Sequence, residues 1–403
     1  MAVYTSTEGQ KDLPRFFAVA FHQLSKIKSG ALDIALPDGR IFQIKAENAG
    51  PNAHVDIINP DVFSRLAREG DMGFSDAYLE GWWTSPDLQA FLDLVFANNS
   101  EVGQGFPGGF LVQYYERFFH WLRGNSKTQA RKNISYHYDL GNDFYGKWLD
   151  ETMTYSSALF KTGQEDMAKA QMQKYEQLCD EMGMKDGDHL LEIGCGWGGF
   201  AEYAAGTRGA QMTCLTISQE QHDFAKERMF KAGLADKVDV VMRDYRDEKG
   251  TYDGIASIEM FEAVGESYWP TYFNAVHDRL KPGANASLQI ITIDNELFPQ
   301  YRKTVDFIQK HVFPGGMLPS PNALRQQVEQ AGMKYIKSVE FGESYSITLR
   351  RWYETFNAAW PEITNASFDQ RFKNMWDFYL TSCAAGFHYG TTDVTQVTIQ
   401  RPK

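Results

Sequence analysis

Between residues 185 and 295, short hydrophobic runs alternate with longer stretches in which hydrophobic residues recur at helical spacing. This alternation is typical of a parallel sheet that is covered by helices. The Pro-Gly pair in Lys281-Pro282-Gly283 predicts a turn before the last strand of this region. The predicted helices include Gln219–Ala232 and Tyr268–Leu280. The predicted strands are His189–Ile193, Gln211–Thr216, Val238–Met242, Tyr252–Ile258 and Ala286–Ile293.

Residues 1–125 show a different pattern, with short strands first and helices after them. We therefore predict a small N-terminal α+β domain over residues 1–125 and a larger, Rossmann-like α/β domain over residues 126–403. The aromatic residues between Gly73 and Trp83 are predicted to belong to the core. The predicted N-terminal elements are the strands Ala31–Leu36, Ile41–Ile44 and His54–Ile58 and the helices Pro60–Arg68 and Leu88–Ala97.

The first strand of the larger domain ends in an acid and a glycine run. Glu192 precedes Gly194-Cys195-Gly196-Trp197-Gly198-Gly199, and a helix start follows. Glycines there let the backbone approach a ligand, and the helix N-terminus attracts negative charge. The spacing fits a dinucleotide fingerprint, but a dehydrogenase also needs an acid about 20 residues further on. Here the next strand ends in Thr216, Ser218 and Gln221, so the pattern favours S-adenosylmethionine (SAM). A dinucleotide and a turn without a ligand are the alternatives.

One more acid follows a strand at the same predicted edge of the sheet. Asp244 comes directly after Val238–Met242 and Arg243. The carboxyl edge of an open α/β sheet is where ligands bind, so Asp244 is placed to meet the adenine amine of SAM. The alternative is a solvated loop acid.

The composition excludes several classes of partner and site. The net charge of −12 argues against nucleic acid as a partner, because phosphate binding needs clustered lysine and arginine. The four cysteines form no CxxC pair and predict neither a zinc site nor disulfides, and we expect no metal. No signal peptide and no membrane-spanning apolar stretch are expected.

The segment from Phe110 to Leu122 carries aromatic residues at helical spacing. Arg123, Lys127, Arg131 and Lys132 follow it without an intervening acid. An aromatic face with basic flanks is typical of an interfacial helix on an anionic bilayer. A helix that packs the two domains together explains the pattern equally well.

Several motifs together resemble the cyclopropane fatty acid synthases and the related mycolic acid methyltransferases. The resemblance covers about residues 130–400, and NPDVFSRLAREGDMGFSDAYLEGWW is also similar to the lipid-side domain of the bacterial synthases. It implies a SAM-dependent enzyme that transfers a one-carbon unit to the double bond of an unsaturated phospholipid acyl chain and gives a cyclopropane fatty acid. Independently of the resemblance, residues 307–320 form an apolar segment interrupted by glycine and proline, which we expect to be a cap over an apolar substrate. In chain order the motifs are YHYDLGNDFY, TYSSALF, LLEIGCGWGGF, LTISQEQ, DYRD, EMFEAVG, VFPGGMLPS and YETFNAAWPEI.

The resemblance also implies the residues of the site. In the synthases a bound bicarbonate ion is implicated as the base that accepts the proton lost on ring closure, and His137 is a further candidate for proton transfer. The bicarbonate ligands of the family fall on Glu262, Tyr345, Ser157, Gln289 and the backbone of Ile291. The SAM contacts fall on Tyr155, Ser156, Gly194, Gly196, Thr216, Ile217 and Gln221, to which the residue pattern adds Glu192 and Asp244.

Two of these positions depart from the family pattern. Ser157 stands where the family has cysteine, and Gln289 stands where it has histidine. A hydroxyl still forms hydrogen bonds, but an amide cannot relay a proton near neutral pH. Methylation or methylenation of an unsaturated chain, including a diene, is therefore the alternative to ring closure. A non-catalytic lipid-binding protein and a small-molecule methyltransferase are more remote alternatives.

The resemblance and the charge pattern together predict where the protein works. We expect a cytoplasmic enzyme in peripheral contact with the inner face of the membrane. A homodimer is an expectation from the resemblance alone.

Overall fold

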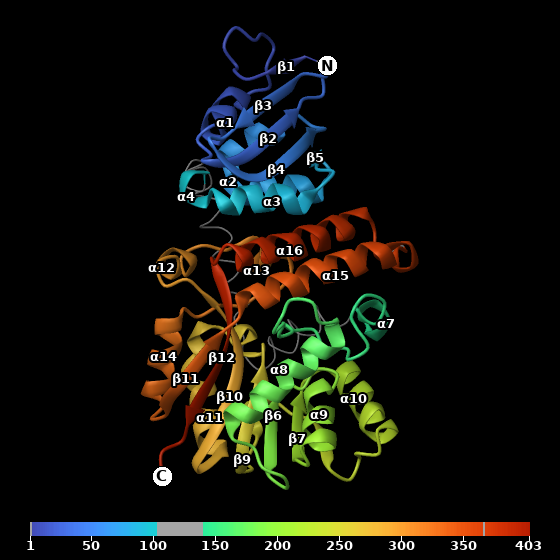
Figure 1. Ribbon diagram of the computed structural model, residues 1–403, viewed down its shortest axis with the longest axis vertical. Helices are drawn as coiled ribbons and strands as arrows, with labels where there is room; N and C mark the ends of the chain where they lie inside the picture. The colour runs from blue at the N-terminus through green and yellow to red at the C-terminus, as the bar shows by residue number, and fades with distance from the viewer. Residues whose placement is uncertain (1, 103–139, 366) are drawn as a thin grey trace.

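The computed structural model describes residues 2–102, 140–365 and 367–403. Two sheets lie at opposite ends of an elongated molecule, and the long helices α15 (Gly342–Ile363) and α16 (Gln370–His388) lie between them (Figure 1). The predicted α/β fold with a smaller N-terminal α+β unit is confirmed. The predicted boundary at residues 125 and 126 falls outside the described residues and stays a prediction.

The larger sheet has the strand order β11-β12-β10-β9-β6-β7-β8 within the described residues. Strand β12 is antiparallel to both of its neighbours, and the remaining pairs are parallel. Strand β6 is the middle one of the five parallel strands and is flanked by β9 and β7, so the carboxyl ends of these three strands meet at the same edge. The strands are β6 (His189–Ile193), β7 (Gln211–Thr216), β8 (Val238–Met242), β9 (Tyr252–Ile258), β10 (Leu280–Ile293), β11 (Lys334–Glu340) and β12 (Thr392–Gln400).

Four of the five predicted strands have the observed bounds, whereas the predicted start of β10 is wrong. The strand begins at Leu280 and continues through Lys281-Pro282-Gly283 with a register shift before Asn285. Gly283 N donates to Arg401 O at 2.8 Å, so the C-terminal end of the chain pairs with this segment. Pairing with residues far along the chain therefore extends the strand through a segment whose local sequence predicts a turn.

Helices cover both faces of this sheet. One face packs into a core shared by α8, α9 and α10, and the other packs against α11 and α14. The predicted helices at α10 and α11 are confirmed within one or two residues. The helices are α8 (Met167–Met182), α9 (Gly199–Thr207), α10 (Gln219–Lys231), α11 (Trp269–Arg279) and α14 (Pro321–Gln330), with the short α7 (Asn142–Tyr145), α12 (Phe298–Tyr301) and α13 (Phe307–His311) and the 3₁₀ turns η1 (Tyr245–Asp247), η2 (Phe261–Ala263) and η3 (Glu266–Tyr268).

The N-terminal unit is a small sheet in the order β1-β3-β2-β4-β5 with helices on one side. Its strands alternate buried and more accessible residues, as one-sided burial requires. Trp83 is buried at its centre, which confirms the core assignment of the aromatic segment. Its elements are β1 (Val3–Tyr4), α1 (Phe17–Leu24), β2 (Ser29–Ala35), β3 (Ile41–Lys45), β4 (Asn48–Ile57), α2 (Val62–Leu79), β5 (Trp83–Thr84), α3 (Leu88–Ala97) and α4 (Asn99–Val102).

Two elements of this unit are longer than predicted. Strand β4 begins at Asn48 rather than His54. The prediction missed this part of the strand because its first residues are mostly exposed and lack the hydrophobic alternation. Helix α2 continues past Arg68 to Leu79, across a kink at Gly70 with φ of 64°. A glycine with positive φ commonly ends a helix, but here the chain resumes a helix directly after it.

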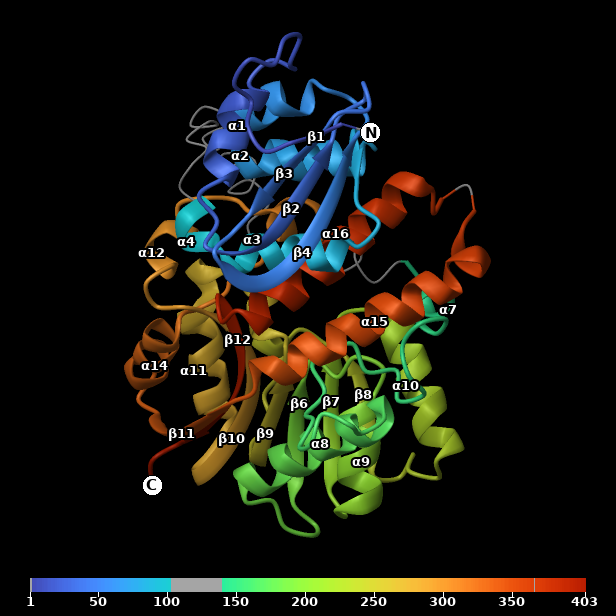
Figure 2. The ribbon, with the colours of Figure 1, turned by 45° about the horizontal axis from the view of Figure 1, so that its top comes forward.

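Helix α16 joins the two units by packing on α2 and α3 (Figure 2). Asp76 of α2 accepts hydrogen bonds from His311 Nε2 at 2.7 Å and Lys310 Nζ at 2.9 Å, both in α13. These two hydrogen bonds and the charge of Lys310 hold the pKa of Asp76 below its usual value despite burial. His311 therefore contributes to the contact between the two units and is not placed for a role in catalysis.

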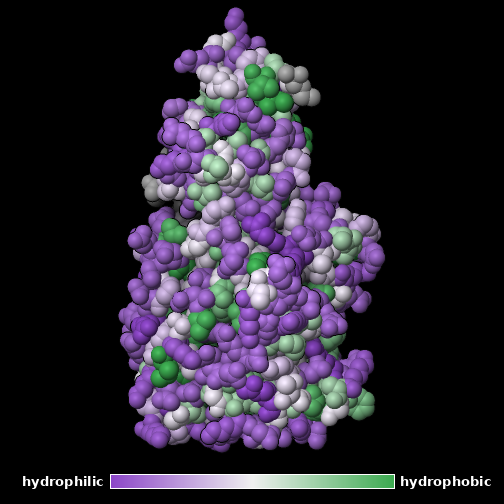
Figure 3. Space-filling view, viewed as in Figure 1, coloured by the Kyte–Doolittle hydropathy of each residue, from purple (hydrophilic) through white to green (hydrophobic). Residues whose placement is uncertain are grey.

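The face of the molecule in Figure 3 is mostly hydrophilic, with small and scattered hydrophobic patches. The large apolar side chains lie mainly in buried clusters inside the two units and between them. Within the described part of the chain, no helix combines the length and the apolar character that a membrane span needs.

Candidate active site

The glycine run forms a turn between β6 and α9 at the carboxyl edge of the sheet. Gly194 and Gly196 both have positive φ, of 82° and 51°. A Cβ at Gly194 would lie 2.7 Å from Met260 Cγ, whereas a Cβ at Gly196 would have nothing within 4 Å. The loop therefore packs on one side against Met260, two residues after β9, and leaves open space on the other.

That open space belongs to a cavity of about 700 Å³. Residues from β6, β7 and the loop after β8 reach it, as a site at the carboxyl edge of an open sheet requires. Every residue that was predicted to contact SAM lines it: Tyr155, Ser156, Glu192, Gly194, Gly196, Thr216, Ile217, Gln221 and Asp244.

Glu192 is the buried acid of this part of the cavity. It is 2% exposed on the central strand, and its Oε2 accepts no hydrogen bond from any described residue. Burial raises the pKa of Glu192 to about 8, opposed by the charges of Arg228 and Lys174. A buried oxygen without a donor is costly. The site therefore fits a ligand that brings a cationic or N–H donor, as the amino-acid end of SAM does.

Polar groups of β7 and α10 hold one another in place nearby. Thr216 Oγ1 donates to Gln221 Oε1 at 3.0 Å, and the side chain of Ser218 caps α10 by accepting from Gln221 N. Asp244 accepts hydrogen bonds from Arg246 N and from the Arg246 guanidinium, with Nη2 at 2.6 Å. Its predicted contact with the adenine amine stays a prediction.

A second acid, Glu259, follows β9 directly and lines the same cavity. Its Oε1 accepts from Ser157 N and from Gln289 Nε2, both at 2.8 Å, and its Oε2 accepts from Tyr345 Oη at 2.6 Å. Its φ is 49°, a backbone conformation that few residues other than glycine adopt. Sequence reasoning missed this residue.

Gln289 is oriented from behind by the neighbouring strand. Its Oε1 accepts from Gln396 Nε2 of β12 at 3.0 Å, which directs its Nε2 toward Glu259. The amide of Gln289 therefore donates to a carboxylate of the chain itself. The Ser157 hydroxyl does form a hydrogen bond, but its Oγ donates to Ala158 O and only its backbone N–H donates to Glu259.

Glu262 lies one 3₁₀ turn further, in η2. Its Oε1 accepts from Ile291 N, and its Oε2 has no partner among the described residues. Burial and the charge of Glu259 raise the pKa of Glu262 to about 8. Burial also raises the pKa of Glu259, but Lys174 and the donors Tyr345 and Gln289 oppose the rise. Of the two acids, Glu259 is therefore the one that is held as the anion.

A buried lysine lies behind both parts of the site. Lys174 of α8 is 0% exposed, and its Nζ donates to Ser156 Oγ at 2.7 Å. Burial lowers the pKa of Lys174 to about 7, while the charges of Glu259 and Glu192 raise it. In the sequence this residue is one lysine among the polar positions of a predicted helix, and nothing marks it as buried.

The comparisons with known proteins agree with this geometry. The model of the mycolic acid cyclopropane synthetase family matches residues 125–397. The chain belongs to that family. The enzyme is a SAM-dependent methyltransferase, and the open cavity at the glycine loop and the unpartnered oxygen of Glu192 fit that donor.

Curated relatives match nearly the whole chain. The tuberculostearic acid methyltransferase UfaA1 of Mycobacterium tuberculosis (strain ATCC 25618 / H37Rv) is 37% identical over 86% of this chain and 82% of its own length. The cyclopropane-fatty-acyl-phospholipid synthase of Escherichia coli (strain K12) is 34% identical over 92% of this chain and 96% of its own. Among solved structures, mycolic acid cyclopropane synthase CmaA1 complexed with SAH and CTAB has a TM-score of 0.63 and 27% identity, covering 67% of this chain and 98% of that one.

The residues predicted to hold bicarbonate are together, but they do not fit that ion. Gln289, Tyr345 and the backbone of Ser157 already donate to Glu259, and Ile291 N already donates to Glu262. Gln289 and Ser157 do not reach the cavity, whereas Glu259 does. His137 lies outside the described residues, so its predicted role in proton transfer stays a prediction.

Proposed function

We propose that this methyltransferase adds the methyl carbon of SAM to the double bond of an unsaturated phospholipid acyl chain and closes a cyclopropane ring. One observation carries the proposal. The cavity that begins at the glycine loop continues into the apolar interior of the N-terminal unit. A small polar acceptor would not need such an apolar cavity, whereas an acyl chain is long and apolar enough to occupy it.

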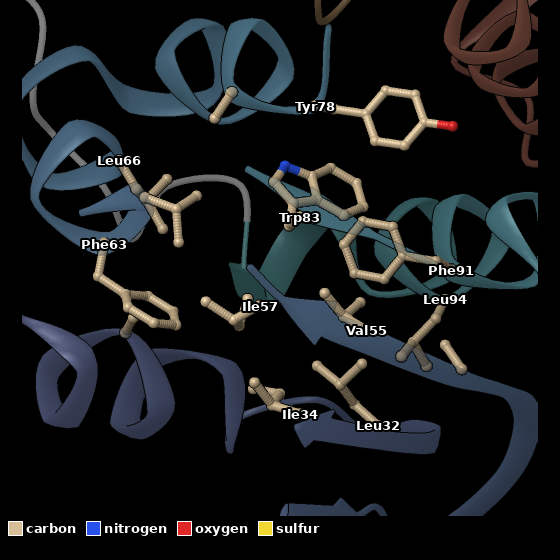
Figure 4. Close-up of a cluster of buried hydrophobic side chains, with 14 of the residues drawn as sticks. Leu32, Ile34, Val55, Ile57, Phe63, Leu66, Tyr78, Trp83, Phe91 and Leu94 are labelled. Carbon is tan, nitrogen blue, oxygen red and sulfur yellow. The ribbon is translucent and has the colours of Figure 1, made fainter. Parts of the chain in front are cut away.

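The far end of the cavity is lined almost entirely by hydrocarbon. Phe63, Leu66 and Phe91 converge with strand residues of the small sheet (Figure 4). The apolar surface removed from water there favours a hydrophobic chain by about 25 cal/mol per Å² buried. The strand residues are Leu32, Ile34, Val55 and Ile57.

The segment past β10 was predicted to be an apolar cap, and several of its residues line the cavity. Phe307, Ile308, Phe313 and Met317 line the cavity from this segment. Gln309 Nε2 donates to Gly316 O at 3.0 Å, which closes the segment on itself. Such a cap excludes water from the acyl chain, and water would otherwise trap a carbocation.

Aromatic side chains surround the region between the donor loop and the cap. Tyr155 and Tyr379 contact each other through their hydroxyls at 3.0 Å, and Phe313 packs against Tyr379. SAM supplies an electrophilic methyl group, and its transfer to an alkene leaves a cation on the acyl chain. Ring faces stabilise a nearby cation by about 0.5 to 2 kcal/mol each.

The product is the finer part of the proposal. Ring closure is supported by the cyclopropane synthase of Escherichia coli, which matches nearly end to end, and by an anionic carboxylate at the site. A methyl or methylene branch is the second candidate, because the tuberculostearic acid methyltransferase is slightly more similar.

The test is a product analysis with purified enzyme, SAM and vesicles of a cis-monounsaturated phospholipid. We expect an acyl chain that is heavier by one CH₂ and that shows cyclopropane protons in NMR spectra. Vesicles of the saturated phospholipid are the control and should give no product. Exocyclic methylene or branched-methyl signals instead of ring signals would replace the first candidate by the second.

We also propose peripheral contact with the inner face of the membrane and a homodimer, as the sequence predicts. The aromatic segment 110–122 and the basic residues after it lie outside the described residues. Co-sedimentation with anionic liposomes should weaken after charge reversal at Arg131 and Lys132. Binding that is insensitive to salt and to the reversal would contradict an electrostatic contact.

A further inference from the structure

We propose that the carboxylate of Glu259 is the catalytic base of this enzyme and takes the place of an exogenous bicarbonate ion. The inference rests on the proposed one-carbon transfer to an alkene. It predicts that turnover does not depend on bicarbonate, because the chain supplies its own anion.

The first support is the set of donors around Glu259. Three groups from three separate segments of the chain point hydrogen-bond donors at one carboxylate: Ser157 N, Gln289 Nε2 and Tyr345 Oη, at 2.6 to 2.8 Å. Gln289 and Ser157 are also the two positions that depart from the family pattern. The departure at Gln289 serves this group, since its amide NH₂ is suited to an acceptor that is fixed in place, whereas Ser157 contributes the backbone N–H that any residue would supply.

The second support is the backbone of Glu259. It lies one residue after β9 with φ of 49°, and its N–H donates to Gln289 O at 2.8 Å. A residue with a Cβ is strained in this conformation, and such strain persists mainly where the surroundings enforce it at functional sites. The left-handed turn carries the side chain to the cavity, in front of Gln289 and Ser157, which do not reach it.

The third support is the surrounding charge. Among the described residues, Lys174 stabilises the charged form of Glu259, and the charge of Glu259 in turn raises the pKa of Glu262. Lys174 is fully buried and attracts the anion at Glu259. Glu262 has one donor and one unpartnered oxygen, so it favours the protonated state and leaves the negative charge on Glu259. This division suits a single base beside a neutral carboxyl group.

The reaction then balances without a further reactant. The alkene π pair forms a C–C bond to the SAM methyl, the C–S bond breaks, and its electrons stay on sulfur as S-adenosylhomocysteine (SAH). The cation on the acyl chain accepts the electron pair of a C–H bond of the new methyl group, which closes the ring. The released proton goes to Glu259, which later returns it to solvent.

The first test compares the wild-type enzyme in CO₂-free buffer with and without added sodium bicarbonate, with SAH release and lipid product as readouts. We expect turnover to be equal within a factor of two. A loss of tenfold or more in CO₂-free buffer that bicarbonate restores would overturn the inference. Failure of the proposed function is distinct, because the wild-type enzyme would then give no lipid product in either buffer.

The second test uses a matched pair of variants at one position. Glu259→Gln keeps the size of the side chain and removes the base, and we expect at least a 100-fold loss of turnover that bicarbonate does not restore. Glu259→Gly opens the space between the three donors and relaxes the backbone, and we expect an equal loss that bicarbonate or formate partly restores with saturation. Calorimetric binding of SAH reports whether each variant is folded. Near wild-type turnover of folded Glu259→Gln would overturn the inference.

Discussion

The affinity for SAM should fall at least tenfold when Gly196 is replaced by alanine, while the protein stays folded. The new methyl group would meet no protein atom within 4 Å, so it would occupy space in the cavity that the donor needs. The positive φ of 51° costs an alanine about 1 to 2 kcal/mol of folding free energy. Calorimetry with SAM and thermal unfolding measure the two effects separately.

Gly233→Ala is the matched control for this prediction. Gly233 has φ of 69°, and a Cβ there would also have nothing within 4 Å, but the residue is exposed and does not line the cavity. We expect the same loss of stability and an unchanged affinity for SAM. Equal affinities of the two variants would show that the space beside Gly196 is not where the donor binds.

Replacing Glu192 by glutamine should raise stability and weaken SAM binding at the same time. The pKa of Glu192 is about 8 in the folded protein, against 4.5 for a free carboxyl group. Between these pH values the folded state holds a proton that the unfolded chain has released. The free energy of unfolding therefore falls as the pH rises from 4.5 to 8. Glutamine removes this loss, which is at most about 3 kcal/mol at pH 7.

The same substitution removes the charge that would pair with the donor. A hydrogen bond to a charged group contributes about 1.5 to 3 kcal/mol, so the affinity for SAM should fall about 10- to 100-fold. Ionisation of Glu192 on binding should also make the affinity of the wild-type enzyme rise from pH 6 to 8 more steeply than that of the variant. Calorimetry across this range measures both quantities.

Glu262→Gln is the control for the effect of Glu192. Burial gives Glu262 the same raised pKa of about 8, so its glutamine variant should gain stability over the same pH range. Its affinity for SAM should not change, because Glu262 lies at the reaction end of the cavity. If Glu192→Gln bound SAM as tightly as this control, the assignment of Glu192 to the amino-acid end of the donor would be wrong.

The parallel sheet was predictable because each strand carries its own signal. Strands such as β6 and β9 are short and mostly hydrophobic, and helices of ordinary length separate the strands of the sheet. Local signals failed where distant pairing decides the structure. The start of β10 depends on the C-terminal residues around Arg401, and the length of β4 includes residues that are mostly exposed.

The SAM side of the site was also predictable, since the glycine run and Glu192 lie in one short segment. The base was not. Glu259 lies in the same motif as Glu262, which the resemblance marked, and the donors to Glu259 come from residues 157, 289 and 345. The available signal was the departure at Gln289, whose amide NH₂ needs a hydrogen-bond acceptor. Only the fold shows that this acceptor is a carboxylate of the chain.

The most direct test of the whole account is one reaction with SAM that carries a fully deuterated methyl group. Wild-type enzyme, CO₂-free buffer and a cis-monounsaturated phospholipid are combined, and the product is analysed by mass spectrometry and NMR. The account predicts a cyclopropane that retains two of the three deuterium atoms, because one leaves as the deuteron that Glu259 accepts. Retention of all three deuterium atoms, or a product that forms only after bicarbonate is added, would contradict it.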